Sequence, residues 1–418
     1  MVNGGGDEVT SSSATQATWR SLFASREFLA VWASRGLSLV GDQLARVAVT
    51  ILVFDRTGSP MLTAAVYALS YVPWLVGGPL LSGLADRYPR RTMMIICDLA
   101  SAALVAAMAI SGLPLVVLCA LLFLVVLIES PFTSARAALL VDLFPDDRYV
   151  LASALMNITL QVGQVVGFAL GGALVATLGT HQSLLIDAGT FLASAGLIAL
   201  FVSSRPVPTG EETGSQGWWA RMTAGARLIV GDRRLRGLVL VALLATFWVV
   251  PEGLAAPYIK NLGGSPTEVG FFLAAQPTGG AVGYLIIGRL VRPVRRLELI
   301  GPLAVLSCLP LVGCLFHPGL VPTLVLLALS GLGTSYNVPA NAAFMQLVPP
   351  ESRGQAFGLV STALIAGQGI TIALGGAIAN YVSAPTVVAV AGALGAVAAA
   401  RAVMTNRKIV AQIVPSLN

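Results

Sequence analysis

Residues 163–173 read GQVVGFALGGA and residues 367–377 read GQGITIALGGA, with seven of the eleven positions identical at an offset of 204 residues. Three further matches keep this order at nearly the same offset: GSP at 58–60 with 264–266, GLADRYPRR at 83–91 with GRLVRPVRR at 288–296, and RAA at 136–138 with NAA at 341–343. One such match is weak in a chain rich in Gly, Ala and Leu. Their common order and offset indicate an internal repeat of two halves. Two related halves in an apolar chain are typical of secondary transporters, whose substrate sites lie between the halves.

The composition of the chain points to a membrane protein. Charged residues make up 11% of the sequence and hydrophobic residues 56%, whereas charged residues are roughly 25% of a soluble domain. Stretches long enough to cross a hydrocarbon core of ~30 Å recur along the whole chain. Because period-2 alternation is absent, these stretches must be helices, and we expect an all-α membrane protein.

Twelve such stretches are predicted, six in each half, as a pair of pseudo-symmetric six-helix bundles. They cover about residues 29–54, 60–84, 92–112, 114–140, 151–178, 183–203, 236–258, 268–291, 297–315, 319–346, 354–381 and 384–404. The predicted organisation is an N-terminal segment 1–28, a first bundle 29–203, a linker 204–235 with a short interfacial helix, a second bundle 236–404 and a tail 405–418.

The placement of the positive charges predicts the orientation in the membrane. Of the 25 Lys and Arg residues, Arg56 and Lys260 fall in odd-numbered connections, and Arg35, Arg46 and Arg136 fall inside spans. The others lie in the termini, the even-numbered connections or the adjoining span ends. This asymmetry predicts that both termini are cytoplasmic. It also explains the net charge of +6 as a topology signal, with membrane lipids and not nucleic acid as the partner.

Charged residues inside the spans are the candidate functional residues, because a charge in hydrocarbon is costly and usually faces a bundle interior or an aqueous path. In the first span, Arg35, Asp42 and Arg46 fall within about 20° of one line on the helix. At spacing i and i+4, Asp42 and Arg46 can also neutralise each other, which is a purely structural interpretation.

The other candidates occupy corresponding spans. Glu129 and Arg136 lie on one face of the fourth span, and Asn337 and Asn341 lie one turn apart in the tenth. Pro251-Glu252-Gly253 predicts a break in the seventh span that presents Glu252 to a cavity. Asp98 and Asp187 lie nearer to span ends, where a structural role is equally expected.

Carboxylates in such positions are natural proton carriers, since burial disfavours their charged form and a neighbouring arginine favours it. We therefore expect a proton gradient as the energy source, with no cofactor and no metal. The chain has no GxxxxGK[ST] pattern and no HExxH, GxSxG or CxxC motif, so neither an ATP-driven pump nor an enzyme is indicated.

The connection after the second span, Ser82-Gly-Leu-Ala-Asp86-Arg87-Tyr-Pro-Arg90-Arg91, resembles motif A of the major facilitator superfamily, GxLADRxGRR. Ser82 and Pro89 depart from that pattern. The resemblance implies that Asp86 helps to latch the cytoplasmic side against the N-terminal end of a helix of the other half. Arg87, Arg90 and Arg91 would be its charged surroundings. The alternative is that these charges only anchor the topology.

The fifth span carries Gly163, Gly167, Gly171 and Gly172, which resemble motif C of the antiporters although Phe168 stands where that motif has proline. Spaced glycines also let helices approach closely, so plain helix packing is an equal alternative. GDQ in the first span, PF…AR in the fourth, DAGTF in the sixth and PEGL in the seventh resemble the drug:proton antiporter branch of macrolide and enterobactin exporters.

The resemblance implies an exporter of a small organic compound (a drug, natural product or siderophore-like molecule) that exchanges it for protons by alternating access. It implies a monomer in the cytoplasmic membrane of a bacterium. A proton-coupled importer on the same fold is one alternative, and a membrane receptor or assembly partner that transports nothing is another.

Overall fold

The computed structural model describes residues 22–81, 88–144, 148–205 and 218–413. Twelve helical stretches within these residues are long and apolar enough to cross a membrane, which confirms the twelve predicted spans. The described residues contain no β-strand. The first half contains α2 (Arg26–Thr57), α3 (Pro60–Leu69), α4 (Val72–Leu81), α6 (Arg90–Met108), α7 (Leu115–Leu143), α8 (Arg148–Leu178) and α9 (Thr180–Phe201).

The second half is more segmented. It contains α11 (Arg233–Ala242), α12 (Ala245–Trp248), α13 (Val250–Gly253), α14 (Ala255–Asn261), α15 (Pro266–Arg289), α16 (Pro293–Glu298), α17 (Ile300–Leu306), η1 (Leu309–Phe316), α18 (Leu320–Gly333), η2 (Thr334–Tyr336), α19 (Asn337–Leu347), η3 (Pro350–Ser352), α20 (Arg353–Ala379) and α21 (Ala384–Ile413). Between the halves lies α10 (Trp218–Gly231), which packs against α20.

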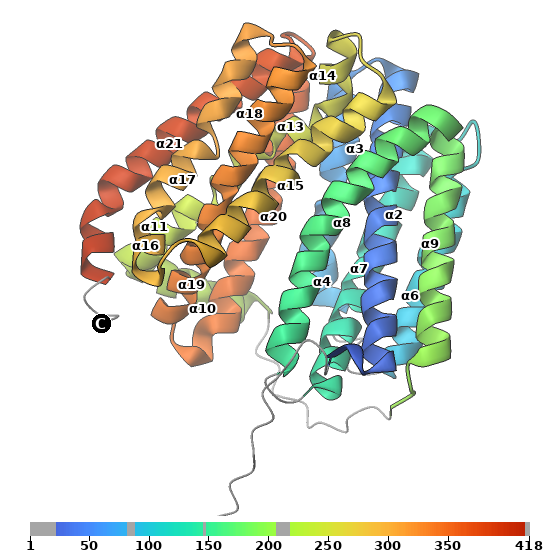
Figure 1. The fold of residues 1–418 in the computed structure, drawn as a ribbon, viewed down its shortest axis with the longest axis horizontal. Helices are drawn as coiled ribbons and strands as arrows, with labels where there is room; N and C mark the ends of the chain where they lie inside the picture. Colours follow the sequence, from blue (N-terminus) through green and yellow to red (C-terminus); the bar gives the residue numbers. More distant parts are fainter. Residues whose placement is uncertain (1–21, 82–87, 145–147, 206–217, 414–418) are drawn as a thin grey trace, which may run out of the picture.

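The helices form two bundles, one from each half of the chain (Figure 1). In the first bundle α2 packs on α8 and α9, and α6 on α7 and α9; in the second, α15 packs on α18 and α21 on η1. We call the end of the molecule that carries the turns at Gly58, Gly112, Gly179 and Gly263 the distal end, and the opposite end, where α2 begins at Arg26, the basal end.

The repeated GSP sequence lies at a turn before a helix in both halves, although the left-handed glycine is Gly58 of the motif in the first half and Gly263, just before it, in the second. Gly58, with φ 60°, ends α2 in the left-handed conformation, which glycine adopts without steric cost. Ser59 then caps α3 by accepting a hydrogen bond from Leu62 N, and Pro60 occupies the first turn. In the second half, Pro266 again begins the helix, and Glu268 Oε2 accepts a hydrogen bond from Ser265 N at 2.5 Å. The motif is thus a compact distal turn between the first two spans of each half.

The seventh span is broken, as its Pro-Glu-Gly sequence predicts. It is divided into α11, α12, α13 and α14, and the short α13 contains Pro251, Glu252 and Gly253. The ninth span was expected to be one helix, but it changes to the 3-10 helix η1 at Leu309. Pro310 explains this change, because proline removes a backbone donor and its ring clashes with the preceding turn.

The two halves meet at the distal end. Gly172 of α8 lies against Gly270 and the Pro266 carbonyl of α15, and Gly376 of α20 lies against Ala64 and the Pro60 carbonyl of α3. These pairs bring helix backbones together at a distance that no larger residue allows. The other three glycines of the fifth span pack α8 onto α2 within the first bundle: Gly163 contacts Leu39, Gly167 contacts Val40 and Gly171 contacts Leu44.

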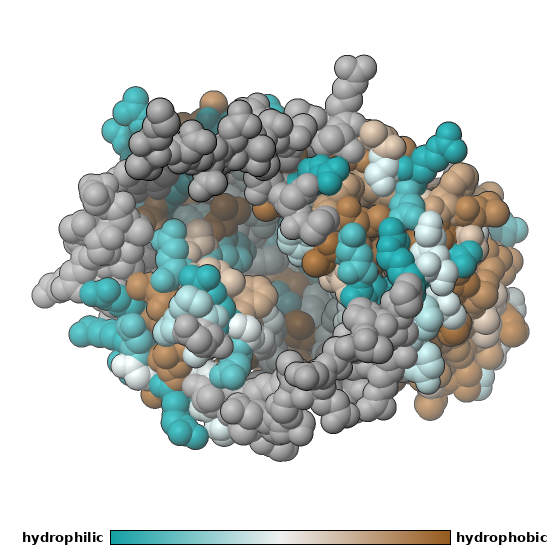
Figure 2. Space-filling model, turned by 90° about the horizontal axis from the view of Figure 1, so that it is seen from below, coloured by the Kyte–Doolittle hydropathy of each residue, from teal (hydrophilic) through white to brown (hydrophobic). Residues whose placement is uncertain are grey.

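At the basal end the halves diverge. In Figure 1, α8 and α15 meet near the top of the molecule and separate toward the bottom. Seen from the basal end, the molecule is hollowed between the halves, and hydrophilic residues lie around this opening (Figure 2). We call this hollow the basal opening. The structure is therefore closed distally and open basally.

Replacing Gly172 by alanine should loosen the distal closure. The added Cβ would lie 2.7 Å from Gly270 Cα and 2.8 Å from Pro266 O, both of them backbone atoms that cannot rotate away. Overpacking of this kind costs about 1–3 kcal/mol, which would change the ratio of closed to open distal ends by about five- to 150-fold. Distances between spin labels at the exposed positions Leu178 and Tyr381 would report the change.

The control is Gly189→Ala in α9, where an added Cβ meets nothing within 4 Å. Equal label distances in both variants would show that the Gly172–Gly270 contact does not set how closely the halves approach.

Candidate functional site

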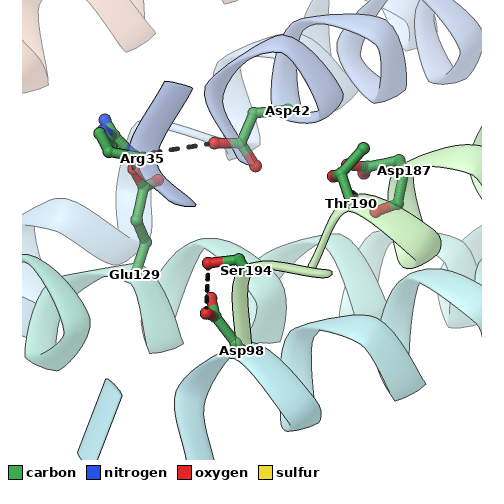
Figure 3. Close-up of polar contacts among 7 residues, drawn as sticks. All are labelled: Arg35, Asp42, Asp98, Glu129, Asp187, Thr190 and Ser194. Atoms are coloured by element: carbon green, nitrogen blue, oxygen red, sulfur yellow. Dashed lines mark hydrogen bonds and ion pairs between the residues drawn. The ribbon is translucent and has the colours of Figure 1, made fainter. Parts of the chain in front are cut away.

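The polar line on α2 lies inside the first bundle, where Arg35 joins two carboxylates. Its Nη1 atom lies 3.3 Å from Glu129 Oε1 on α7 and 4.0 Å from Asp42 Oδ2 on the same helix. The side chains of Arg35, Asp42 and Glu129 are 13%, 21% and 23% exposed. Figure 3 shows the guanidinium between the two acids. One cation is therefore shared by two largely buried anions.

This arrangement corrects the pairing that the sequence suggested for Asp42. Its ion pair is with Arg35, two turns away, and not with Arg46, one turn away. The difference arises because Glu129, on a neighbouring helix, holds Arg35 at the level of Asp42. Arg46 lies within electrostatic range of Asp42, Glu129 and Glu252 without an ion pair to any of them.

Arg136 remains apart from Glu129, two turns along the same face of α7. Its Nη1 atom is buried without a hydrogen-bond partner, and its guanidinium carbon lies 5.9 Å from the centre of the Phe132 ring. This cation is held by an aromatic ring and offers a buried donor to a further acceptor.

Glu252 lies where the two halves touch. Tyr67 Oη of α3 donates a hydrogen bond of 2.7 Å to Glu252 Oε2 of the broken helix α13. The break at Pro251 makes this possible, because it turns the carboxylate away from a regular helical ladder. The residue that the sequence assigned to a cavity is therefore also a direct link between the halves.

Two further carboxylates belong to the same region, although their sequence positions favoured a structural role equally. Asp98 of α6 is 2% exposed and accepts a hydrogen bond of 2.6 Å from Ser194 Oγ of α9. Asp187 of α9 is 1% exposed, accepts one of 3.2 Å from Thr190 Oγ1, and packs against Gly41, next to Asp42. Figure 3 shows all four acids in this region. Their charge within a predicted span could have identified both residues from the sequence. The predicted span bounds placed them too close to the ends of their helices.

The second bundle contributes neutral polar groups. Asn337 is half-buried at the start of α19 and Asn341 is exposed on it, so both stay outside the acidic region of the first bundle. Elsewhere in the second bundle, the buried Gln276 donates to the Trp248 carbonyl at 3.0 Å and to Ser330 Oγ at 3.3 Å. The two halves share the arrangement of their helices but not the placement of their charged residues.

Of the motif A residues, Asp86 and Arg87 lie outside the described residues. Arg90 forms an ion pair with Asp142 and donates to the Ala138 carbonyl of α7 at 3.1 Å, and Arg91 donates to the Ala199 carbonyl of α9 at 2.6 Å. Both arginines thus tie the basal start of α6 to neighbouring helices of their own half.

Comparison with known proteins assigns the family. The model of the Major Facilitator Superfamily matches the chain twice, over residues 31–254 and 252–411. The chain belongs to the Major Facilitator Superfamily. It is a multi-pass membrane transporter and not an enzyme, which confirms the resemblance of the motif A sequence.

Its relatives are distant. Macrolide efflux protein A of Streptococcus pyogenes is 23% identical over 348 residues, covering 80% of this chain and 85% of that protein. The multidrug efflux pump Tap of Mycolicibacterium fortuitum is 27% identical over 354 residues, covering 81% and 86%. The enterobactin exporter EntS of Shigella boydii is 28% identical over 371 residues, covering 83% and 84%.

Among solved structures, the nucleoside transporter NupG is similar with a TM-score of 0.70 at 13% identity, covering 90% of this chain and 98% of that one. The POT family transporter PepTSo is similar with a TM-score of 0.68 at 14% identity, covering 94% and 99%. These structures confirm the twelve-helix fold.

Removing the shared cation should destabilise this superfamily member. Arg35→Met leaves Asp42 and Glu129 as uncompensated buried charges, and breaking a buried pair costs about 3–5 kcal/mol. The loss should shrink as the pH is lowered, because protons then neutralise the two acids. Thermal unfolding of the purified protein in detergent at several pH values would measure it.

Arg205→Met is the matched control, since Arg205 Nη2 pairs with Glu27 Oε2 at 2.6 Å and the Arg205 side chain is 34% exposed. Because the Arg205 side chain is more exposed than that of Arg35 and serves one carboxylate only, its removal should cost less. An equal, pH-independent loss in the two variants would contradict the assigned role of Arg35.

Proposed function

We propose that this transporter exports a small organic compound across the cytoplasmic membrane of a bacterium in exchange for protons, by alternating access. It works as a monomer among membrane lipids, without cofactor or metal. The observation that carries the proposal is the Arg35 guanidinium shared by Asp42 and Glu129. Groups of this kind inside a transporter can change partners when a proton arrives.

Export is supported by the relatives. Proteins that match about four-fifths of the chain are named for macrolide efflux, multidrug efflux and enterobactin export. A drug, a natural product or a siderophore-like molecule is therefore the substrate class proposed for this chain.

The orientation follows from the charges. Helices begin or end with arginine at the basal end, as at Arg26, Arg148, Arg233, Arg289 and Arg353. The positive-inside rule then places the basal end, with both termini, in the cytoplasm. On this assignment the basal opening of Figure 2 faces the cytoplasm, and the structure is ready to receive a substrate from inside.

Protonation would act through Arg35. When Asp42 is ionised, it competes with Glu129 for the guanidinium of Arg35. The ion pair between Arg35 and Glu129 then connects α2 and α7 at the height of Asp42. A proton on Asp42 removes that competition, so that Arg35 binds Glu129 alone. The packing between the two helices is then different in the two protonation states, which is what alternating access needs from its coupling group.

Glu252 connects this charge system to the junction of the halves. Its hydrogen bond to Tyr67 exists only while the distal ends are together, since the two residues belong to different bundles. Opening the distal side would expose Glu252 to the outer solution, where it can take up a proton. One elementary charge moved across about 100 mV is worth ~2.3 kcal/mol, enough for a roughly fifty-fold gradient of a neutral solute.

Transport in proteoliposomes tests the direction and the coupling together. Purified protein would be reconstituted with a pH-sensitive dye inside, and flux of a macrolide, a catechol siderophore and a lipophilic cationic dye would be followed under imposed pH gradients. Solute movement opposite to proton movement supports export by antiport. Movement in the same direction as protons identifies an importer, and absence of flux with all probes favours a receptor or assembly partner.

Asp42→Asn and Glu252→Gln should each abolish pumping against a gradient, by at least about tenfold in the accumulation ratio. Both substitutions keep side-chain size and remove titration. Asp55→Asn is the matched control, because Asp55 is an exposed acid near the distal end of the same helix α2 as Asp42. The proton-carrier role fails for both residues if the variants insert normally and pump with an unchanged pH profile, and Glu129 would then be the next candidate.

The latch implied by motif A gives a separate expectation. If Asp86 docks on the N-terminal end of α20, which begins at Arg353, its charge contributes ~0.3–1 kcal/mol and up to ~2 kcal/mol when partly buried. Asp86→Asn should therefore change the ratio of outward- to inward-open states by roughly two- to thirtyfold and slow turnover. Spin-label distances across the basal face would measure this ratio. Val291→Asp, at the corresponding position of the second half, should change it much less, and unchanged distances in Asp86→Asn would leave Asp86 as a topology residue.

A further inference from the structure

A small cavity lies inside the first bundle, beside the Arg35 ion pairs. Its polar lining comes from three helices, and its free space for the centre of a water-sized molecule is about 20 Å³. That is enough for one water molecule. The polar lining residues are Arg35, Ser38, Asp42, Asp98, Ser101 and Glu129.

One polar atom of this lining has no partner in the protein. Ser38 is 2% exposed, and its Oγ is buried without a hydrogen bond. Ser34, one turn earlier on the same helix, is fully buried but donates to the Val31 carbonyl at 2.9 Å. A buried hydroxyl group without a hydrogen-bond partner destabilises the fold unless a molecule in the cavity binds it. We therefore expect a bound molecule within hydrogen-bond distance of the Ser38 hydroxyl.

The charges of the lining do not balance. Among the lining residues described, three carboxylates (Asp42, Asp98 and Glu129) face one cation, Arg35, which Asp42 and Glu129 already share. Asp98 is bound by the uncharged Ser194 hydroxyl, which does not compensate a full negative charge in a buried site. Arg46 and Arg136 lie within electrostatic range of Asp42, but Asp98 forms no ion pair with either, so Asp98 is the acid of this lining best placed to carry a proton.

We propose that the cavity holds a water molecule that links Ser38, Asp42 and Asp98, and that Asp98 shares an exchangeable proton with Asp42 through this water. This proposal rests on the proposed proton antiport and adds Asp98 to it as a second proton-carrying residue. In the transfer, Asp98 gives its carboxyl proton to the water while the water gives one of its own to Asp42. The water is regenerated and one proton has moved from α6 to α2, with no other bond changed.

The surroundings of Asp98 determine whether Asp98 or Asp42 holds the shared proton. Arg35 and Asp42 face it from α2 and Glu129 from α7, while Cys97 is its neighbour on α6. From α9 it meets Ser194, with Asp187 two turns away on that helix. When Arg35 binds Asp42, the proton stays on Asp98; when Arg35 turns to Glu129 alone, Asp42 receives it. All of these groups belong to α2, α6, α7 and α9 of the first bundle.

Infrared titration of the purified protein tests this without any transport measurement. The carboxyl stretching band would be followed from about pH 4 to about pH 10 in normal and heavy water. In the parent protein we expect a band of a buried protonated carboxyl that is lost in Asp98→Asn. Ser38→Ala keeps every carboxyl group but removes one hydrogen-bond partner of the water. The pH midpoint at which the Asp98 band is lost should therefore move by about 0.5 to 1 pH unit in this variant.

Ser34→Ala is the matched control, because it removes a buried hydroxyl of the same helix that is already bonded, and it should leave the midpoint in place. If Asp98→Asn does not fold, Ser194→Ala replaces it in the test. This variant keeps the Asp98 carboxyl group but removes the hydroxyl that donates to it, so the Asp98 band should shift. An identical spectrum in Asp98→Asn and in the parent overturns the role of Asp98. Equal midpoints in Ser38→Ala and Ser34→Ala overturn the water link.

The outcome is separable from that of the proposed function. If the Asp98 band titrates as expected but proteoliposomes show no proton flux, the shared proton stands and the antiport fails. If antiport is measured and the band is absent, Asp98 is a structural residue and the proton is carried elsewhere.

Discussion

The cost of burying charge in a membrane protein organises the first bundle of this transporter. Arg35 lies between Asp42 and Glu129, so that one guanidinium serves two helices. Asp98 and Asp187 are bound by hydroxyl groups of α9. Each acid has a partner, yet the partners do not supply enough positive charge for all of them. Such an arrangement is the basis of the proposed proton coupling, because burial disfavours the charged form of an acid and a neighbouring cation favours it.

The junction between the halves depends on a second constraint, the close approach of helix backbones. Gly172 and Gly270 let α8 and α15 touch, and Gly376 does the same for α20 on α3. Buried side chains of both halves, among them Tyr67, Val250 and Ile372, pack in one hydrophobic cluster around these glycine contacts. Tyr67 and Glu252 add one polar bond across the same junction. The halves are therefore held together distally by backbone contacts, apolar packing and one hydrogen bond.

Much of the fold could be read from the sequence because lipid leaves the backbone few choices. The apolar spans had to be helices, and their number, order and approximate bounds agree with the structure. The Pro-Glu-Gly sequence predicted a break in the seventh span, and the structure has the short α13 there. The ninth span was predicted as one helix but contains a 3-10 segment from Leu309. A single proline, Pro310, hardly changes the mean hydropathy of a span, but it interrupts the backbone hydrogen bonds of an α-helix.

For the site, the sequence determined which charges lie within the membrane and on which helix face, because helical periodicity fixes both from spacing alone. It could not determine partners. Asp42 binds Arg35 where spacing favoured Arg46, Arg136 rests on Phe132, and Asp98 and Asp187 lie in the acidic region although both seemed close to span ends. Only the tertiary structure decided these pairings, since a long side chain is shared among neighbours on several helices. The strongest acceptor within reach belonged to another helix, and nothing in the local sequence records which helix that is.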